Sequence, residues 1–247
     1  MTPAAVTSAA SDRIQRGRIP GIVGDSRAPA GRRARDITGA PVVHLITHPF
    51  VHDALATLRD ASTPPDIFRR VARRMSLLIA AEVLKEVPTI EGTVQTPLGA
   101  AFARRVGARV TLVPVLRAGL GMIDGVLDLL PTARVGHIGL QRDETTARAS
   151  RYYVKLPPDL EDDVVLVTDP MLATGGSAVA AIDLLRAAGA RDVRFVCVVA
   201  SPEGIAAIER RYPDVPIYTP VVDRELNAHK FIVPGLGDFG DRLFGTV

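Results

Sequence analysis

The amino-acid sequence predicts an α/β fold in which a mostly parallel central sheet is flanked by helices. Apolar runs without polar alternation recur along the chain, which is typical of strands that are buried on both faces. Segments with apolar residues at helical spacing lie between these runs. Of the 247 residues, 47% are hydrophobic and only 4% are aromatic, so the core must consist mainly of aliphatic side chains.

The expected elements alternate along most of the chain. Strands are predicted at six apolar runs: 41–46, 109–116, 133–140, 163–169, 193–200 and 215–222. Helices are predicted at four segments: 66–86, 120–130, 177–188 and 203–211. The second half therefore reads as a βαβαβ unit. Ligands of such sheets bind beyond the carboxyl ends of the strands, so loops that follow strands are the expected site.

The first 40 residues differ in composition from the rest. They are rich in Ala, Ser, Gly, Pro and Arg and show no sustained apolar period, which predicts a disordered tail followed by one domain over residues 41–247. An organellar transit peptide is an alternative, although three Asp residues and a poor amphipathic pattern count against it. A cytoplasmic location is expected, because Cys197 is the sole cysteine and cannot form an intrachain disulfide.

The charge distribution gives no indication of a polyanionic partner. The net charge is +3, but residues 1–36 carry seven Arg and three Asp, which leaves −1 for the remaining 211 residues. A nearly neutral body argues against the basic face that nucleic-acid binding requires, and it leaves a local basic patch as the alternative. No apolar stretch reaches the roughly 18 residues of a membrane helix. We therefore expect neither a nucleic-acid nor a membrane partner.

The segment VVLVTDPMLATGGSAVAAIDLL, residues 164–185, carries the clearest chemical signal. An apolar strand ends at Asp169, and a short loop leads through adjacent glycines into a helix. Glycines let the backbone turn its N–H groups inward, nearby hydroxyls add donors, and the helix N-terminus favours an anion. The pattern predicts a phosphate cradle, with a simple capped turn as the alternative. A methyl group at Gly176 should intrude on the phosphate and oppose a positive φ.

The same segment resembles the loop of the type I phosphoribosyltransferases that binds 5-phosphoribosyl pyrophosphate (PRPP). Most members carry two consecutive acids, whereas Pro170 follows Asp169 here, as in the uracil-specific branch, whose pattern D-P-M-L-A-T-G-G-S matches throughout residues 169–177. The resemblance implies that the whole loop binds PRPP: Asp169, Pro170, Met171, Leu172, Ala173, Thr174, Gly175, Gly176 and Ser177.

Two arginines stand in further segments that resemble this branch. VPVLRAGLGMIDG, residues 113–125, resembles the segment whose arginine faces the pyrophosphate, which implies that role for Arg117. GLQRDETT, residues 139–146, resembles the mobile flap, which implies that Arg142 also reaches PRPP. Gln141 stands where the family usually has tyrosine. The resemblance thus marks Arg117, Arg142 and Asp169 as the catalytic residues.

The C-terminal segment LNAHKFIVPGLGDFGDRLFGT, residues 226–246, resembles a small hood that recognises uracil. Its glycines formally spell G-x-G-x-x-G, but the seven residues after the last glycine leave no room for a dinucleotide-binding unit. Glycines and Pro234 instead predict a rigid loop whose main-chain groups read a small flat ligand, and uracil offers acceptor, donor and acceptor along one edge. The resemblance marks Ile232, Gly237, Asp238 and Phe239 for uracil, with Asp238 also near PRPP.

The resemblance implies a uracil phosphoribosyltransferase, which converts uracil and PRPP to UMP and pyrophosphate. Mg²⁺ is the expected cofactor, held through PRPP and water rather than by protein side chains. A GTP effector and a homo-oligomer, dimer or tetramer, are further implied. A PRPP-sensing regulator with little catalysis is the alternative, and a transferase for another base such as a purine is a second one. Lys230 and Phe231 depart from the Gly-Tyr that the family usually has.

Three other patterns have ordinary explanations. His44, His48 and His52 are spaced four apart, but Pro49 and the strand-like segment before it should break a helical metal stripe. Tyr152 and Tyr153 can either pack or contact a ligand. A basic run in the helix 66–86 is either a solvated face or a subunit or effector contact: Arg69, Arg70, Arg73 and Arg74.

Overall fold

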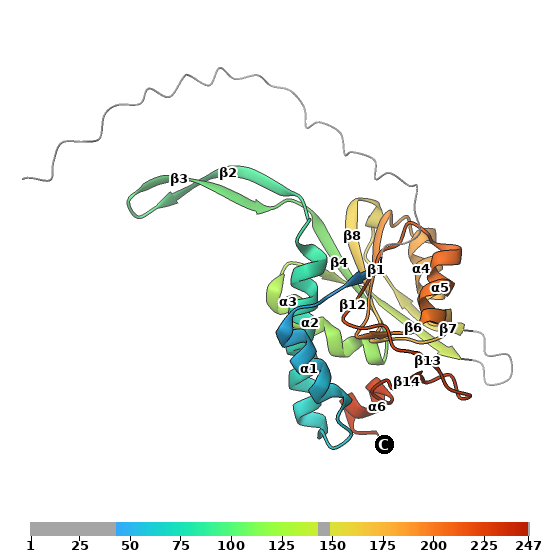
Figure 1. The fold of residues 1–247 in the computed structure, drawn as a ribbon. Helices are drawn as coiled ribbons and strands as arrows, with labels where there is room; N and C mark the ends of the chain where they lie inside the picture. The colour runs from blue at the N-terminus through green and yellow to red at the C-terminus, as the bar shows by residue number, and fades with distance from the viewer. Residues whose placement is uncertain (1–42, 143–148, 247) are drawn as a thin grey trace, which may run out of the picture. The chain divides into compact units, whose positions relative to one another are not determined.

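An eight-stranded sheet forms the centre of the structure, a computed structural model that describes residues 43–142 and 149–246 (Figure 1). The strand order is β1-β12-β10-β8-β4-β6-β7, and β5 also pairs with β4. The strands are β1 (Val43–Leu45), β4 (Arg109–Leu116), β5 (Arg134–Val135), β6 (His137–Arg142), β7 (Ala149–Lys155), β8 (Asp163–Thr168), β10 (Asp192–Val196) and β12 (Ile217–Thr219).

The sheet confirms the predicted mostly parallel architecture. Every neighbouring pair is parallel except β6 and β7, which run antiparallel. The strand β7 was not predicted. It follows β6 after residues 143–148, which lie outside the described part, as do the predicted tail at 1–40 and the first two residues of the predicted domain.

Helices cover both faces of the sheet, which explains why its central strands lack polar alternation. In β8, Val164 and Leu166 belong to one buried cluster, and Val165 and Val167 belong to the other. The first cluster includes residues of α1 (Pro49–Arg59), α2 (Pro65–Leu84), α3 (Ile123–Leu129) and α6 (Phe239–Phe244). The second includes residues of α4 (Gly176–Ala187) and α5 (Pro202–Arg211). Successive side chains of a strand point to opposite faces, so both sets must be apolar.

Several predicted strands are shorter than their apolar runs. The run 133–140 divides into β5 and β6 at Gly136, whose N–H donates to Leu112 O at 2.9 Å. The run 193–200 divides into β10 and the short strand β11 (Val199–Ala200), and the run 215–222 contains only β12. Prolines 216 and 220 border β12, and proline has no N–H for the sheet ladder.

Two helices differ from prediction. The segment 120–130 begins as a 3₁₀ helix, η1 (Ala118–Met122), and continues as α3. The helix α1 was not predicted, because Pro49 was interpreted as a break. Pro49 occupies the first turn, where its missing N–H costs nothing, and His48 caps the helix by accepting a hydrogen bond from Phe50 N at 3.2 Å. His44 lies in β1 and His52 in α1, so the three histidines do not share one helix.

A hairpin of β2 (Thr89–Thr96) and β3 (Gly99–Val106) extends away from the sheet and its helices (Figure 1). We call it the arm. Large apolar side chains on it are exposed, including Leu98 (100% exposed) and Phe102 (63%). The sequence did not predict the arm, since polar and apolar residues alternate poorly along both strands. A two-stranded hairpin is marginal in water by itself, so its exposed apolar surface requires an explanation.

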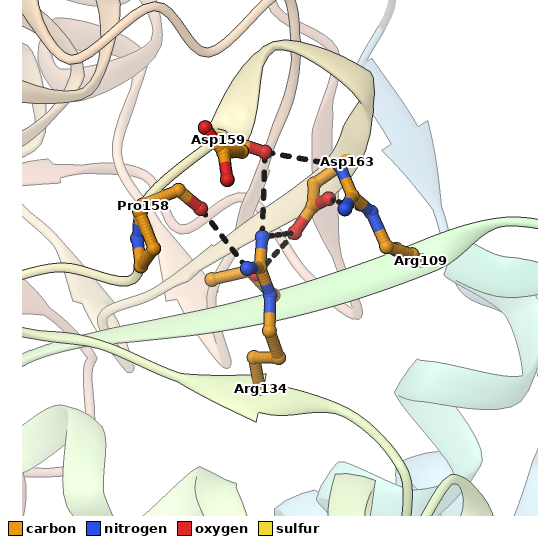
Figure 2. A network of polar contacts seen from close by, with 6 residues as sticks. Arg109, Arg134, Pro158, Asp159 and Asp163 are labelled. Carbon is orange, nitrogen blue, oxygen red and sulfur yellow. Dashed lines mark hydrogen bonds and ion pairs between the residues drawn. The ribbon is translucent and has the colours of Figure 1, made fainter.

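A buried carboxylate holds the amino ends of β4 and β8 together (Figure 2). Thr111 Oγ1 donates to Asp163 Oδ2 at 2.5 Å, and Arg134 donates to the same oxygen. Arg109 Nε lies 3.0 Å from Asp163 Oδ1 in an ion-pair contact. The two arginines also donate to the main chain at Asp159, at 3.1 Å from Arg109 and 3.4 Å from Arg134. This network lies at the end of the strands opposite to their carboxyl-end loops.

Burial raises the pKa of Asp163, but hydrogen bonds from Thr111 and Arg134 and the charges of both arginines outweigh it, so the pKa lies below its usual value. The carboxylate therefore stabilises the fold above the ordinary pKa of aspartate, and that contribution disappears as the pH falls through the lowered value. We predict that Asp163→Asn lowers the free energy of unfolding at pH 7 by about 1 to 3 kcal/mol, since both arginines remain partly hydrated.

Urea unfolding of wild type and Asp163→Asn at pH 7 and near pH 3 measures this effect, and the two curves should approach each other in acid. Asp159→Asn is the matched control, because Asp159 serves the network through its carbonyl and adopts a left-handed φ of 56°, which asparagine tolerates. An equal loss in both variants would contradict the role of the buried carboxylate.

No helix within the described residues is long and apolar enough to cross a membrane.

Candidate active site

Carbonyl groups of the loop between β8 and α4 accept hydrogen bonds from the segment that follows β10. Ser201 donates to this loop twice, from its N–H to Leu172 O at 2.9 Å and from Oγ to Ala173 O at 2.6 Å. Pro170 O accepts from Val198 N at 2.9 Å and from Val199 N at 3.0 Å. Within the loop, β9 (Met171–Leu172) pairs in parallel with β11. These contacts fix the path of the loop.

The amino end of α4 opens onto a pocket of about 190 Å³. The helix begins at Gly176, and its N-cap, Gly175, supplies no side-chain acceptor. N–H groups in the first turn of a helix have no acceptor four residues earlier, so they are available to an anion. Ten residues line the pocket: Asp169, Met171, Leu172, Ala173, Thr174, Gly175, Gly176, Ser177, Ala178 and Lys230. They include all of the predicted loop except Pro170, which is buried.

The two glycines of the loop have different tasks. Gly175 has φ +77°, and an added Cβ would lie 2.5 Å from Ala207 Cβ and 2.9 Å from Gly204 O. Gly176 is outside the left-handed region, and an added Cβ would meet Thr174 Oγ1 at an ordinary 3.7 Å. The expectation of a positive φ at Gly176 was therefore wrong. The chain turns at the N-cap, and the following residue is already helical.

Asp169 connects the loop to the C-terminal segment electrostatically. Its N–H donates to Val196 O at 3.1 Å, and its Oδ1 accepts a long hydrogen bond from Met171 N at 3.4 Å. Burial, with a smaller contribution from the negative charge of Asp238, raises the pKa of Asp169 to about 7, although the hydrogen bond from Met171 N opposes this rise. The carboxyl is surrounded by protein although the residue retains some accessible surface. Two predicted site residues from distant segments thus lie close enough to interact.

Arg117 lies directly after β4 and reaches the same region. Its Nη2 donates to Asp241 Oδ1 at 3.1 Å, and 59% of its side chain is exposed. The following η1 packs closely on the end of β8, because an added Cβ at Gly119 would lie 2.3 Å from Thr168 O. The structure therefore brings the arginine after β4 and the acid after β8 to the same C-terminal segment, through Asp241 and Asp238 respectively.

Arg142 ends β6, and its main chain pairs with Ala149 of β7. Since β6 runs parallel to β4 beside it, their carboxyl ends share one edge of the sheet. The side chain of Arg142 and residues 143–146 of the predicted flap lie outside the described part, so a contact of Arg142 with PRPP stays a prediction. Tyr152 and Tyr153 on β7 are exposed, and the ring of Tyr152 covers Gly139.

A clamp that the sequence analysis missed holds the C-terminal segment. Asp223 accepts from Gly235 N at 2.8 Å, and Arg59 Nη1 donates to Gly235 O at 3.1 Å. The two side chains also bind each other, with Arg59 Nη2 2.6 Å from Asp223 Oδ1. Arg59 ends α1 and Asp223 follows β12, 164 residues away, so no local pattern could have indicated the pair.

Arg242 fixes the next part of this segment. Its guanidinium lies over the Phe68 ring, 4.6 Å from the centroid, and donates to Leu236 O at 2.7 Å and to carbonyls at the end of α1. Phe239 is 1% exposed and packs edge-on against Phe68 with centroids 5.0 Å apart. Ile232 is also buried. These side chains belong to the core, so main-chain groups are what they can offer a ligand.

The remaining two uracil candidates shape the loop. Gly237 has φ +81°, a conformation that glycine adopts without steric cost. Asp238 is exposed and caps α6 by accepting from Asp241 N at 2.9 Å. The C-terminal segment therefore presents a fixed backbone next to Asp169.

Other ionisable residues of the described part have structural partners or are buried. Among the described residues, no group of three or more His, Cys, Asp or Glu side chains could hold a metal ion. Burial raises the pKa of the Cys197 thiol to about 12, which makes it inert at neutral pH. The basic run on α2 is engaged within the chain through four contacts: Arg69 with Leu243 O, Arg70 with Asp66, Arg73 with Asp128 and Arg74 with Asp53.

Comparisons with known proteins agree with this site. Residues 45–246 match the sequence profile of the family described as uracil phosphoribosyltransferase. A uracil phosphoribosyltransferase from Dictyoglomus thermophilum is 51% identical over 206 residues, which cover 83% of this chain and all of that protein. One from Symbiobacterium thermophilum is 50% identical over 205 residues, 83% of this chain and 98% of that protein. A solved structure from Aquifex aeolicus is similar at TM-score 0.79 and 34% identity, covering 82% and 98% of the two chains.

The matched region contains every predicted site residue, including the loop after β8, Arg117 and the C-terminal segment. Identity near one half over almost the full length of two relatives goes far beyond a shared fold. The chain belongs to the uracil phosphoribosyltransferase family.

Proposed function

We propose that the protein transfers the phosphoribosyl group of PRPP to N1 of uracil and releases UMP and pyrophosphate. One observation carries the proposal: the pocket at the amino end of α4 adjoins both Asp169 and the fixed C-terminal segment. A phosphate site, a carboxylate and a base-reading backbone are what this bimolecular reaction needs in one place.

In this reaction the bond from ribose C1′ to pyrophosphate oxygen breaks, the bond from C1′ to uracil N1 forms, and the N1 proton is lost. The first turn of α4 holds the 5′-phosphate, and Asp169 holds the ribose hydroxyls. Arg117 exchanges its contact with Asp241 for the departing pyrophosphate, whose growing negative charge it stabilises. The scheme needs no side-chain nucleophile.

Base specificity follows from the main chain of the C-terminal segment. The Arg59–Asp223 clamp at Gly235 and Arg242 at Leu236 fix the backbone immediately before Gly237, so the segment is ordered before the base arrives. A preorganised donor, acceptor and donor edge accepts uracil, whereas cytosine would leave buried polar groups unpaired.

Mg²⁺ fits the site as an ion held mainly by oxygens of PRPP and water. Asp169, Asp238 and Asp241 lie around the site, but no group of three or more His, Cys, Asp or Glu side chains among the described residues could hold a metal ion by itself. When bound, the ion would neutralise part of the pyrophosphate charge.

A radiolabel assay tests the proposed function. The protein is mixed with PRPP, Mg²⁺ and labelled uracil, cytosine, hypoxanthine or orotate, and the products are separated. We expect UMP from uracil and no product from the other bases. Product from a purine would support the alternative transferase, and PRPP binding without any product would support a regulator. Family membership and the C-terminal segment beside the pocket favour the enzyme.

The predicted role of Arg142 gives a kinetic test. An arginine that closes over PRPP acts chiefly on pyrophosphate departure, so Arg142→Ala should lower kcat by about tenfold to a hundredfold with little change in KM for uracil. Steady-state kinetics with each substrate varied in turn measures both constants. Unchanged kcat with a raised KM for uracil alone would remove Arg142 from the pyrophosphate site.

We propose a homo-oligomer in which the arm packs on a second copy of the chain. A hairpin with exposed Leu98 and Phe102 needs a partner surface, and a cavity of about 270 Å³ lies beside its base. That cavity is apolar and is lined by Ala81, Leu84, Val87, Val106, Val110, Leu129 and Leu130. Apolar surface on both features suits a self-complementary interface.

Light scattering after gel filtration checks this proposal. Phe102→Asp should shift the protein to a smaller species at micromolar concentration, because it places a charge in an apolar interface. Arg105→Asp on the same strand, at an exposed polar position, is the control. An unshifted Phe102→Asp, or a monomeric wild type, would contradict the proposed arm contact.

Residues 1–40 are proposed to lie outside the catalytic domain 41–247, since the family match begins at residue 45. Activation by GTP and a cytoplasmic location stay predictions that rest on the sequence.

A further inference from the structure

Lys230 stands at the end of the turn that connects β13 (Glu225–Leu226) with β14 (Ile232–Val233). It has φ +65°, a left-handed conformation that is costly for a residue with a side chain. Asn227 enforces this turn: its carbonyl accepts from Lys230 N at 2.9 Å, and its side chain accepts from His229 N and Phe231 N, each at 3.0 Å. The hairpin therefore fixes the backbone conformation of Lys230.

This turn places Lys230 in the lining of the pocket at the amino end of α4. Of the ten residues that line the pocket, Asp169 and Lys230 are the ionisable ones, and Lys230 is the basic residue among them. Within the described part of the chain, no carboxylate forms an ion pair with Lys230. The other hydrogen-bond donors at the pocket are backbone N–H groups and hydroxyls, which carry no full charge.

We propose that Lys230 binds the 5′-phosphate group that PRPP and UMP share. The inference rests on the proposed function and adds a binding residue to it. A phosphate monoester carries about −1.5 to −2 charges at pH 7, more than the partial positive charge of one helix end can neutralise. Lysine suits this task as a mobile point charge that needs no fixed geometry. Lys230 lies on the C-terminal segment, whereas the other residues that line the pocket lie on the loop after β8 and in α4. It therefore binds the phosphate from the side of the C-terminal segment.

A contact to the 5′-phosphate has a distinctive thermodynamic signature. The group stays unchanged during the reaction, so Lys230 stabilises substrate, transition state and product alike, and its loss should weaken binding without lowering kcat. Arginines at the pyrophosphate would instead affect PRPP and not UMP. Comparing UMP with PRPP therefore separates the two kinds of contact.

Calorimetric titration of UMP and of PRPP into the full-length chain tests the proposal. Lys230→Gln should weaken both ligands by the same factor, about fivefold to tenfold for one charged contact at an exposed side chain. Lys230→Arg should stay within about twofold of wild type, since it keeps the charge. Inhibition by inorganic pyrophosphate should be unchanged in both variants. The melting temperature of each variant should lie within about 3 °C of wild type, which excludes unfolding as the cause.

Lys155→Gln is the matched control, because Lys155 is an exposed lysine that pairs with His137 at the amino end of β6, away from the pocket. It should bind both ligands as wild type does. Normal binding by Lys230→Gln, or weakening of PRPP without UMP, overturns the assignment while the proposed function stands if wild type forms UMP. A wild type that neither binds these ligands nor forms UMP overturns both.

Discussion

Replacing Gly176 by alanine is expected to weaken PRPP binding by about tenfold to a hundredfold and to leave the fold intact. The added methyl group meets only Thr174 Oγ1, at 3.7 Å, so the protein itself has room for it. That room lies in the pocket where a phosphate must approach the N–H groups of the first turn of α4. The methyl group therefore displaces the ligand and not the protein, and the lost contacts are charge-assisted hydrogen bonds.

Gly175→Ala provides the contrast one residue earlier. Its methyl group would lie 2.5 Å from Ala207 Cβ, and its φ of +77° disfavours any side chain. We expect a loss of about 2 to 4 kcal/mol in the free energy of unfolding from the combined strain and overlap. Calorimetric titration of PRPP and thermal melts of both variants measure the two effects. A folded Gly176→Ala that binds PRPP as tightly as wild type would remove the cradle from the site, and equal stability of the two variants would contradict the division of tasks.

The loop between β8 and α4 could be predicted because its chemistry is contiguous in sequence. A strand, an acid, two glycines and a helix occupy 22 consecutive residues, and each has a local cause. The apolar strands of the sheet were predictable for a related reason, since burial on both faces leaves a continuous signal. The local sequence could not show which of the two adjacent glycines, Gly175 or Gly176, has the positive φ. That depends on Gly204 and Ala207 of α5, which approach from elsewhere in the fold.

Features that depend on pairing across the fold were missed. The Arg59–Asp223 clamp joins residues 164 positions apart, and neither residue stands out in its own segment. The arm shows no regular apolar alternation in its sequence. Its largest apolar residues are exposed and do not pack on one face of the sheet core. The helix α1 was missed because Pro49, which begins this helix, was interpreted as a residue that breaks one. For the clamp and the arm, the decisive information is the partner surface, which a single sequence does not contain.

Asp169→Asn is expected to stabilise the ligand-free protein at pH 8 and to lower turnover. The folded-state pKa of Asp169 is about 7, mainly because the carboxyl is buried and also because Asp238 lies nearby, whereas an unfolded aspartate titrates near 3.8. Between these values the folded protein retains a proton that the unfolded chain has released. The free energy of unfolding therefore falls as the pH rises from about 4 to about 7, and the cost of the buried charge is complete above that range.

Asparagine carries no charge, so Asp169→Asn should gain about 2 to 4 kcal/mol at pH 8 and little below pH 4. Its side-chain oxygen can still accept from Met171 N, which keeps the local geometry. Turnover should fall by about tenfold to a hundredfold, because a neutral amide binds the ribose hydroxyls more weakly than a carboxylate.

Thermal melts at pH 5 and pH 8 without ligand, together with steady-state kinetics at pH 8, measure both effects. Asp238→Asn is the control: asparagine caps α6 as well as aspartate does, yet it removes the charge that raises the pKa of Asp169. This variant should retain a smaller dependence of stability on pH than wild type. If Asp169→Asn were no more stable than wild type at pH 8, the carboxyl would not be destabilised by burial. If turnover were unchanged, Asp169 would not hold the ribose. A gain in stability together with a loss of turnover would show that the charge of Asp169 destabilises the folded protein but is needed to bind the ligand.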